Sequence, residues 1–146
     1  MIYSFSDSMG LFVRTWGSDF HVQLLTETML NKSIIDLNKE ISLLWKNKKI
    51  IDIEILDRGD KQILPSIVSS EKNTKKGKIS IYRPKGAKPG KRGDPRFWPY
   101  GLNKMAKPKD KLIIFGESRF IILIILDPEN IRNPKKIVNE INSLLN

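Results

Sequence analysis

The sequence predicts a mainly β fold with peripheral helices (an α+β chain) that forms one domain over residues 1–146. Three observations lead to this prediction. About seven short apolar runs are separated by turn residues, as expected of mostly antiparallel strands. The last segment of the chain has the apolar spacing of a helix. A length of 146 residues, of which 40% are hydrophobic, suffices for one modest core and little more.

The first third of the chain predicts two strands and a short helix. Residues 11–13 are apolar and predict a short strand, which the turn residues 17–19 should end. Residues 21–25 predict a second strand, and residues 27–32 predict a short helix. Residues 33–45 are ambiguous between a helix and a strand, because short apolar runs fit both.

The middle of the chain predicts a hairpin and a further strand. Residues 51–55 alternate isoleucine with acidic residues, which is typical of a half-buried strand. Residues 57–60, Asp-Arg-Gly-Asp, are a good hairpin turn, after which residues 62–69 would return as a strand. Residues 70–77 indicate a polar loop, and residues 78–83 indicate a strand that leads into a basic loop.

The last third predicts two buried strands and a helix. Residues 112–115 and Phe120–Leu126 are continuously apolar, which indicates strands buried on both faces, joined by residues 116–118. A helix should begin at Pro134 and be capped by Asn133. Its apolar stripe consists of Ile137, Val138, Ile141, Leu144 and Leu145.

The positive charge of the chain is concentrated in one segment. The whole chain has 26 Lys or Arg and 16 Asp or Glu, a net charge of +10. Residues 71–111 hold 14 of the basic residues and three acids, and the rest of the chain carries a net −1. This concentration points to a polyanionic partner rather than to a generally basic surface. Lys75 and Lys76 lie in a stretch without aromatics, so any DNA contact that they make should be to phosphate.

The residue types exclude several classes of site. The chain has no cysteine, which excludes disulfides, zinc–thiolate sites and thiol catalysis, and it has one histidine, His21. No acid stands two positions before a lysine, the spacing that common restriction nucleases use to hold a metal ion. Residues 86–92 resemble a phosphate-binding loop, but their glycine spacing is short and no Ser or Thr follows the lysine. We therefore expect no cofactor, no metal and no catalysis in this segment.

Nothing in the sequence targets the chain to a membrane. The longest apolar run, Phe120–Leu126, is seven residues long, whereas a membrane span needs about 20. The first residues lack the basic start and the apolar stretch of a signal peptide. We expect a cytoplasmic protein without a membrane partner.

The most informative segment is the basic loop at residues 83–102. Prolines and glycines exclude regular structure over its first dozen residues: Pro84, Gly86, Pro89, Gly90, Gly93 and Pro95. A long loop inside a compact domain is more often functional or disordered than idle. Phe97, Trp98 and Tyr100 are not needed by a solvated loop, although Phe97 and Trp98 also suit the return of the loop into the core.

The charged side chains of this loop fit the two tasks of a DNA-binding surface. Lysines neutralise phosphates without reading the sequence, which suits Lys85, Lys88 and Lys91. Arginines read guanine through two hydrogen bonds in the major groove. Asp94 stands among positive groups, where it can accept from the amino group of cytosine or orient an arginine. The arginines of the loop are Arg83, Arg92 and Arg96.

Three stretches of the chain resemble a known family. Residues 96–102 (Arg-Phe-Trp-Pro-Tyr-Gly-Leu) and 107–112 (Lys-Pro-Lys-Asp-Lys-Leu) resemble the second DNA-binding arm and the next strand of the B-three-like pseudobarrels. These are target-recognition domains of some restriction enzymes and are related to the plant B-three domains. In that family a basic arm runs into an Arg-aromatic-x-x-Gly stretch, and a Lys-Pro-Gly-Asp turn then opens a strand; here Lys109 replaces the glycine. Residues 14–24 are similar to the first arm, with an extra spacing before His21.

The resemblance implies a seven-stranded open pseudobarrel with two arms that grip the major groove of duplex DNA. Carried over residue by residue, the first arm would supply Arg14, Trp16, Ser18, Asp19, His21 and Gln23. The second arm would supply Arg83, Lys85, Lys88, Lys91, Arg92, Asp94, Arg96, Trp98 and Tyr100.

The function expected from the sequence is therefore site-specific recognition of double-stranded DNA. The chain would be the target-recognition module, at the N-terminus of a larger protein of a restriction-modification system. A nuclease or a GTP-driven motor would then lie elsewhere on that chain or on a partner. Two alternatives remain open: an RNA-binding module, since basic loops with aromatics also bind RNA, and a compact nuclease or toxin that uses His21, Arg14 and Asp52.

Overall fold

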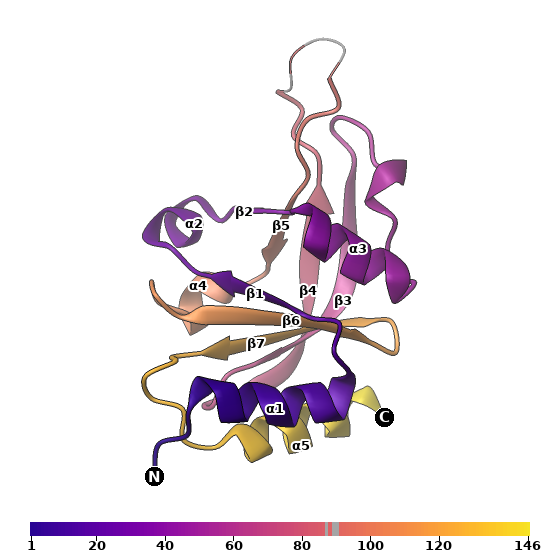
Figure 1. The fold of residues 1–146 in the computed structure, drawn as a ribbon. Coiled ribbons are helices and arrows are strands. Elements are labelled where there is room, and N and C mark those ends of the chain that lie inside the picture. Colours follow the sequence, from indigo (N-terminus) through magenta and orange to yellow (C-terminus); the bar gives the residue numbers. More distant parts are fainter. Residues whose placement is uncertain (87, 89–90) are drawn as a thin grey trace.

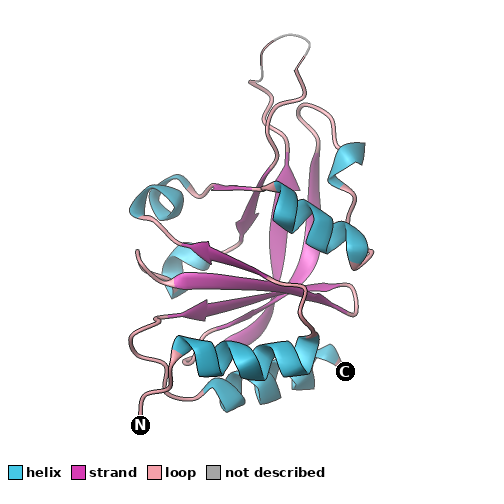
Figure 2. Ribbon diagram, viewed as in Figure 1, coloured by secondary structure: helices cyan, strands magenta, loops and turns pink. Residues whose placement is uncertain are grey.

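The arrangement of strands and helices confirms the predicted fold class. The computed structural model describes residues 1–86, 88 and 91–146, and these contain seven strands, five α-helices and one 3-10 helix (Figure 1, Figure 2). The strands are β1 (His21–Leu24), β2 (Ile35–Asp36), β3 (Lys61–Ser69), β4 (Thr74–Tyr82), β5 (Arg96–Pro99), β6 (Lys111–Glu117) and β7 (Phe120–Leu126). The helices are α1 (Phe5–Trp16), α2 (Glu27–Lys32), α3 (Lys39–Asn47), α4 (Leu102–Met105), α5 (Pro134–Leu145) and the 3-10 helix η1 (Ile53–Ile55).

The strands form one sheet in the order β1-β6-β7-β3-β4-β5-β2. The β3–β7 pair is parallel, and the other pairs of this sheet are antiparallel. The sheet curls into a half-barrel, with the edge strands β1 and β2 beside α3 and with α1 and α5 together below the sheet (Figure 1). The prediction of a seven-stranded open barrel with a C-terminal helix is confirmed, and the observed sheet is curled into a half-barrel.

Side chains along the central strands alternate between two hydrophobic layers, as a period of two requires. One layer faces α2, α3 and α4 and includes Val68, Ile79, Ile81, Leu112, Ile114, Ile121 and Leu123. The other layer faces α1 and α5 and includes Ile67, Ile113, Phe115, Ile122, Ile124 and Leu126. The strands β6 and β7 carry continuous apolar runs because both faces of the sheet are covered there.

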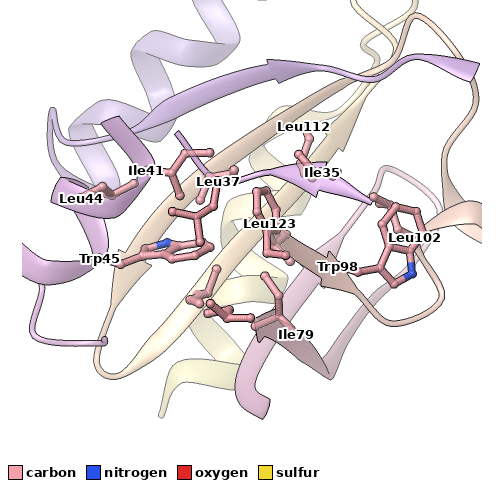
Figure 3. Packing of buried hydrophobic residues seen from close by; sticks show 14 of the residues in the cluster. Ile35, Leu37, Ile41, Leu44, Trp45, Ile79, Trp98, Leu102, Leu112 and Leu123 are labelled. Atoms are coloured by element: carbon pink, nitrogen blue, oxygen red, sulfur yellow. The ribbon is translucent and has the colours of Figure 1, made fainter. Parts of the chain in front are cut away.

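Trp45 of α3 is fully buried in the first layer, at the end of the cluster where Leu44 and Ile41 lie (Figure 3). The Trp45 ring meets the ring of Phe97 edge to face, with 5.4 Å between the ring centroids. Phe97 is fully buried, which confirms the expectation that it returns the basic loop to the core. Figure 3 shows Trp98 and Leu102 at one end of this cluster, and Leu44 and Ile41 of α3 at the other. The start of β5 is therefore anchored on the core.

The structure corrects the strand predicted at residues 11–13, which belong to α1. The side chain of Ser4 caps this helix. Met9, Phe12 and Trp16 are spaced by three and four residues and are buried against the sheet. The helical period extends over twelve residues, and a window of three apolar residues could not reveal it.

The strand predicted at residues 51–55 is also wrong, because this segment contains η1. The carboxylate of Asp52 caps η1 by accepting a hydrogen bond from the N–H of Glu54 at 3.1 Å. Ile53 is buried, whereas Ile55 is 62% exposed, so the isoleucines do not share one face. Alternating polarity alone did not distinguish a strand from a capped turn.

The turn at residues 57–60 is present, but it joins η1 to β3 rather than two strands of a hairpin. Gly59 supplies the positive φ of +86° that this turn needs. The hairpin is formed instead by β3 and β4, which pair from Lys61–Tyr82 to Ser69–Thr74. The polar loop predicted at residues 70–77 is therefore shorter than expected, because β4 begins at Thr74.

Most of the remaining elements lie where the sequence placed them, whereas β5 and α4 were not predicted. The strands β1, β6 and β7 and the helices α2 and α5 overlap their predicted ranges, and the side chain of Asn133 caps α5 as expected. The ambiguous residues 33–45 contain β2 followed by α3. Pro89 and Gly90, two of the predicted loop residues, lie outside the described residues, as does Ala87. Of the helices in the described part, none has the length and apolarity to cross a membrane.

Candidate nucleic-acid interface

The second arm, defined here as residues 83–95, connects β4 to β5, and its described residues project beyond the sheet (Figure 1). Tyr82 at the end of β4 pairs with Arg96 at the start of β5, so the arm leaves the sheet and returns to it at one place. The arm is therefore presented as one unit, supported by the core residues that hold β5.

Arg83 anchors the first end of the arm from inside the protein. Its side chain is 8% exposed, with Nη1 donating to the carbonyl of Gly93 at 2.7 Å and Nη2 to the carbonyl of Ile53 at 3.3 Å. Its backbone N–H donates to the carbonyl of Asp60, and its carbonyl accepts from the N–H of Gly59, both at 3.0 Å. Arg83 therefore ties both ends of the arm to the segment around η1 and is not available to read DNA.

Arg92 anchors the second end of the arm to the same segment. Nε donates to Oδ1 of Asp57 at 3.0 Å, and Nη1 donates to Oε2 of Glu54 at 3.1 Å. Nη2 donates to the backbone carbonyls of Glu54 and Leu56. We call this set of contacts the Arg92 clamp. The guanidinium predicted to read guanine is thus bound to two carboxylates and two carbonyls of the protein itself.

The described residues of the arm line an open hollow of about 760 Å³. The residues that line it combine four positively charged hydrogen-bond donors with one carboxylate. They are Lys88, Lys91, Arg92, Asp94 and Arg96, together with Pro84, Gly86 and Gly93. Lys88, Lys91 and Asp94 are exposed, and so is the neighbouring Lys85. The hollow therefore presents exposed lysine ammonium groups and the Asp94 carboxylate, a hydrogen-bond acceptor, to solvent.

Arg96 differs from the other two arginines of the arm. Within the described residues its guanidinium forms no hydrogen bond or ion pair. Its Nε is buried without a partner, as is the Nε of Arg83, whose two other guanidinium nitrogens are bound. A buried donor left unpaired costs about 1–3 kcal/mol. A ligand can reach the buried Nε only after a local shift of the side chain. The guanidinium nevertheless lines the hollow and is bound by no described residue, which makes Arg96 the arginine of the hollow best suited to bind a ligand.

The two further aromatic candidates do not lie in the arm. Trp98 is 9% exposed and packs in the core layer beside Leu102 (Figure 3). Tyr100 is 42% exposed, but it follows β5, and its N–H donates to the carbonyl of Lys78 at 3.0 Å. Four residues of strand separate Tyr100 from Arg96, which amounts to about 13 Å. Neither ring is placed to stack on a base held in the hollow.

The first arm expected at residues 14–23 is interrupted by secondary structure. Arg14 and Trp16 lie on α1, where Arg14 is exposed and Trp16 is 4% exposed. The Trp16 ring packs against Phe115, and its Nε1 donates to Oδ1 of Asn142 at 3.0 Å. Trp16 is thus a core residue that cannot contact DNA.

Of the first-arm candidates, Ser18 and Asp19 remain in an exposed loop between α1 and β1. His21 and Gln23 lie on β1. Nδ1 of His21 is 2.8 Å from Oε2 of Glu40, and Nδ2 of Asn38 is 3.4 Å from its Nε2. His21 therefore links the edge strand β1 to the start of α3.

Gln23 also makes only local contacts. Its Nε2 donates to the carbonyl of Leu24 at 2.9 Å and lies 4.0 Å from the sulfur of Met29 in α2. Gln23 and His21 hold β1 against neighbouring elements, and this leaves Ser18 and Asp19 as the exposed residues of a much shorter first arm.

The basic segment 71–111 is not one surface. Seven residues of β4 separate Lys75 from Tyr82, which amounts to about 23 Å. Lys75 and Lys76 therefore lie toward the end of β4 that is remote from the arm, and Lys78 lies at its middle. Lys76 places its ammonium 5.5 Å from the centre of the Phe120 ring. The charge that is continuous in sequence is divided between two ends of the hairpin.

The structure also shows two site residues that the sequence argument missed. Glu54 and Asp57 hold Arg92, although they precede it by more than thirty positions. Their sequence signal is an acidic segment, Asp52 to Asp60, which carries four carboxylates immediately before the basic β3–arm region. Opposite charges in the two segments suggest an ion pair between them. Which residues form it is known only from the fold, which brings η1 beside the arm.

The turn at residues 107–110 opens β6, and its Lys107 together with Asp127, which follows β7, has a shifted pKa. The hydrogen bond to Asp110, at 2.6 Å, raises the pKa of Lys107, and a second bond to Asp127, at 3.2 Å, acts in the same direction. The backbone N–H of Glu129 and then the Lys107 ammonium lower the pKa of Asp127. Lys109, which stands where the resembled family has glycine, adopts a φ of +79°.

The residues of the third alternative, a nuclease or toxin, are not assembled into one site. Arg14 lies on α1 at one face of the sheet, whereas His21 contacts α3 at the other. Asp52 forms a 3.9 Å ion pair with Lys46. The described residues contain no group of three or more His, Asp or Glu side chains arranged to hold a metal ion.

Comparisons with known proteins give no independent guide to this site. No protein-family model, no curated protein and no solved structure matches the chain.

Proposed function

We propose that this chain recognises a specific site in double-stranded DNA through the second arm, as the target-recognition module of a restriction-modification system. The observation that carries the proposal is the hollow of the arm, where the Arg96 guanidinium has no partner among the described residues and lies beside the exposed Lys88, Lys91 and Asp94. Lysines supply phosphate contacts, whereas an arginine and an aspartate supply the donor and the acceptor that read base edges.

Two further observations support the proposal. The described residues of the arm project from the sheet, and a projecting loop can enter the major groove, which is about 12 Å wide. The half-barrel and the positive φ at Lys109, in the family's glycine position, are consistent with the resemblance to B-three-like pseudobarrels. In this proposal the chain contributes recognition, and cleavage or translocation belongs to a nuclease or motor domain on the same chain or on a partner.

A titration by fluorescence anisotropy tests the class of nucleic acid. Duplex DNA, single-stranded DNA and single-stranded or duplex RNA of matched length are compared at about 50 and 200 mM salt. We expect tightest binding to duplex DNA, with an affinity that falls steeply as salt rises. Tighter binding to RNA would support the RNA-binding alternative and contradict the proposal.

Two additional measurements complete this test. Selection from random duplexes should yield a consensus site, because a base-reading arm discriminates by about 1–3 kcal/mol at each well-read base pair. Incubation with magnesium or manganese should leave the DNA intact. Cleavage that is lost in a His21→Ala variant would instead identify this chain as a nuclease.

A further inference from the structure

The Arg92 clamp places two negative charges beside the proposed DNA-binding arm, where they oppose phosphate binding. Glu54 and Asp57 have side chains 72% and 77% exposed, and each holds one edge of the Arg92 guanidinium. Electrostatics alone would make these carboxylates unfavourable for a protein that binds a polyanion. Their contacts suggest a different role, namely the positioning of the arm.

The geometry of the clamp requires a guanidinium and not simply a positive charge. Nε and Nη1 of Arg92 reach the two carboxylates at 3.0 and 3.1 Å, and Nη2 reaches the backbone carbonyls of Glu54 and Leu56. A lysine ammonium is a single point with three donors and cannot span four acceptors in this planar arrangement. The clamp therefore fixes the direction of the side chain and, through it, the end of the arm next to Asp94.

Arg83 makes the clamp part of a two-point attachment. Arg83 ties the other end of the arm to the carbonyl of Ile53 and to the turn at residues 57–60. Both attachments end on the same short segment, η1 and the turn after it. The arm is thus held from one side at both of its ends, and the hollow that contains Arg96 lies between these two points.

We infer that Glu54 and Asp57 are positioning residues for DNA binding, which act through Arg92 to hold the second arm in its binding form. This inference rests on the proposed function. An arm held in advance loses less conformational freedom on binding than a loose one. Removal of the two carboxylates should therefore weaken DNA binding, although it makes the protein more positive.

The sign of this effect separates positioning from simple electrostatics. The double variant Glu54→Ala/Asp57→Ala should bind the selected duplex about tenfold more weakly than the wild type. If the carboxylates merely repelled DNA, or competed with phosphate for Arg92, the same variant would bind several-fold more tightly. The variant removes only exposed side chains, and its fold is verified by circular dichroism and thermal melting.

A matched control corrects for the change in net charge. Glu27→Ala/Glu129→Ala also removes two exposed carboxylates, but these lie on α2 and on the loop before α5, away from the arm. This control should bind the duplex as tightly as the wild type or more tightly. Arg92→Lys keeps the charge and should weaken binding as much as the double carboxylate variant does. Combining the two changes should add little, because both break the same contacts.

Amide hydrogen exchange of peptides covering residues 83–96 gives a readout that does not depend on DNA. The double carboxylate variant and Arg92→Lys should both exchange faster in this segment, and the control variant should not. Unchanged exchange, or duplex binding at least as tight as that of the wild type, would overturn the inference. If the wild type bound no duplex DNA, the proposed function would fail instead, and the exchange data would still decide whether the clamp orders the arm.

Discussion

At the scale of single residues, the three arginines of the second arm have different roles because their surroundings differ. Arg83 is buried and Arg92 is held by two carboxylates, so both bind the protein. Arg96 has no partner within the described residues. Residue type alone indicated three equivalent readers of guanine, because an amino-acid sequence does not show which carbonyls and carboxylates a fold brings beside each guanidinium.

Replacement of Arg96 by alanine tests this difference. An arginine that reads guanine contributes about 1–3 kcal/mol of discrimination, so Arg96→Ala should weaken binding to the selected site about tenfold or more. Random duplex should be affected less. The measurement is a competition titration of the selected and the scrambled duplex at one salt concentration. Lys88→Ala, which also removes one charge from the hollow, should weaken both duplexes about equally.

Equal losses on both duplexes for Arg96→Ala would show that the arm only anchors the phosphate backbone. Sequence recognition would then have to come from the exposed residues of the first arm, Ser18 and Asp19.

The lowered pKa of Asp127 gives a pH-dependent prediction for one residue. A carboxyl whose folded pKa lies below its usual value of 3.8 stabilises the fold above that value, and this contribution is lost as the pH falls through the lowered pKa. Asp127→Asn should therefore lower the melting temperature at pH 6. The difference from the wild type should shrink below pH 3.8.

Because the Asp127 side chain is 38% exposed, solvent screening limits this effect to about 1 kcal/mol or less. Thermal melts of both proteins between pH 2.5 and pH 7 give the measurement. A difference that stayed constant over this range would mean that packing, not charge, links Asp127 to its neighbours.

At the scale of elements, the sequence predicted best those segments whose period extends over their whole length. The strands β6 and β7 have long apolar runs, and the helix α5 has a long apolar stripe and an N-cap at Asn133. All three lie where they were expected. The strand expected at residues 11–13 was wrong, because the helical stripe of α1 is spread over twelve residues of mixed polarity. The error at residues 51–55 has a similar cause. Asp52 caps the short helix η1, and in this segment isoleucine and acidic residues alternate as they would in a half-buried strand.

The turn at residues 107–110 offers a stabilising substitution. Pro108 and Lys109 are its central residues, the N–H of Asp110 donates to the carbonyl of Lys107 at 3.1 Å, and Lys109 has a φ of +79°. This geometry favours glycine at the position of Lys109, because a Cβ there is strained by about 1 kcal/mol. Lys109→Gly should raise the melting temperature by about 3 °C.

Lys109→Ala is the matched control for this substitution, because it removes the same charge but keeps the Cβ. The alanine variant should melt at or slightly below the wild-type temperature. A gain of equal size in both variants would attribute the effect to the loss of a positive charge rather than to relief of backbone strain.

At the scale of the whole molecule, the sheet determines which charges act together. The expected number of about seven strands matches the sheet, but two of the predicted strands are wrong and β5 was not predicted. The strand order and the parallel β3–β7 pair did not follow from the sequence, because pairing between distant segments leaves no local pattern. For the same reason the excess charge of residues 71–111 looked like one patch. The β3–β4 hairpin separates it into the second arm and a remote group that includes Lys75 and Lys76.

This separation predicts two different salt dependences. We consider a duplex that is bound at the arm with its axis across the β3–β4 hairpin rather than along it. Lys88→Ala/Lys91→Ala should then reduce the slope of log affinity against log salt concentration by about 1.8, because each phosphate contact contributes about 0.9. Lys75→Ala/Lys76→Ala removes the same charge about 20 Å or more away and should change the slope by less than about 0.5. Anisotropy titrations at four salt concentrations measure both slopes. An equal reduction in the two variants would mean that the duplex lies along β4 and contacts both ends, because only that orientation brings the remote lysines to the same phosphate backbone.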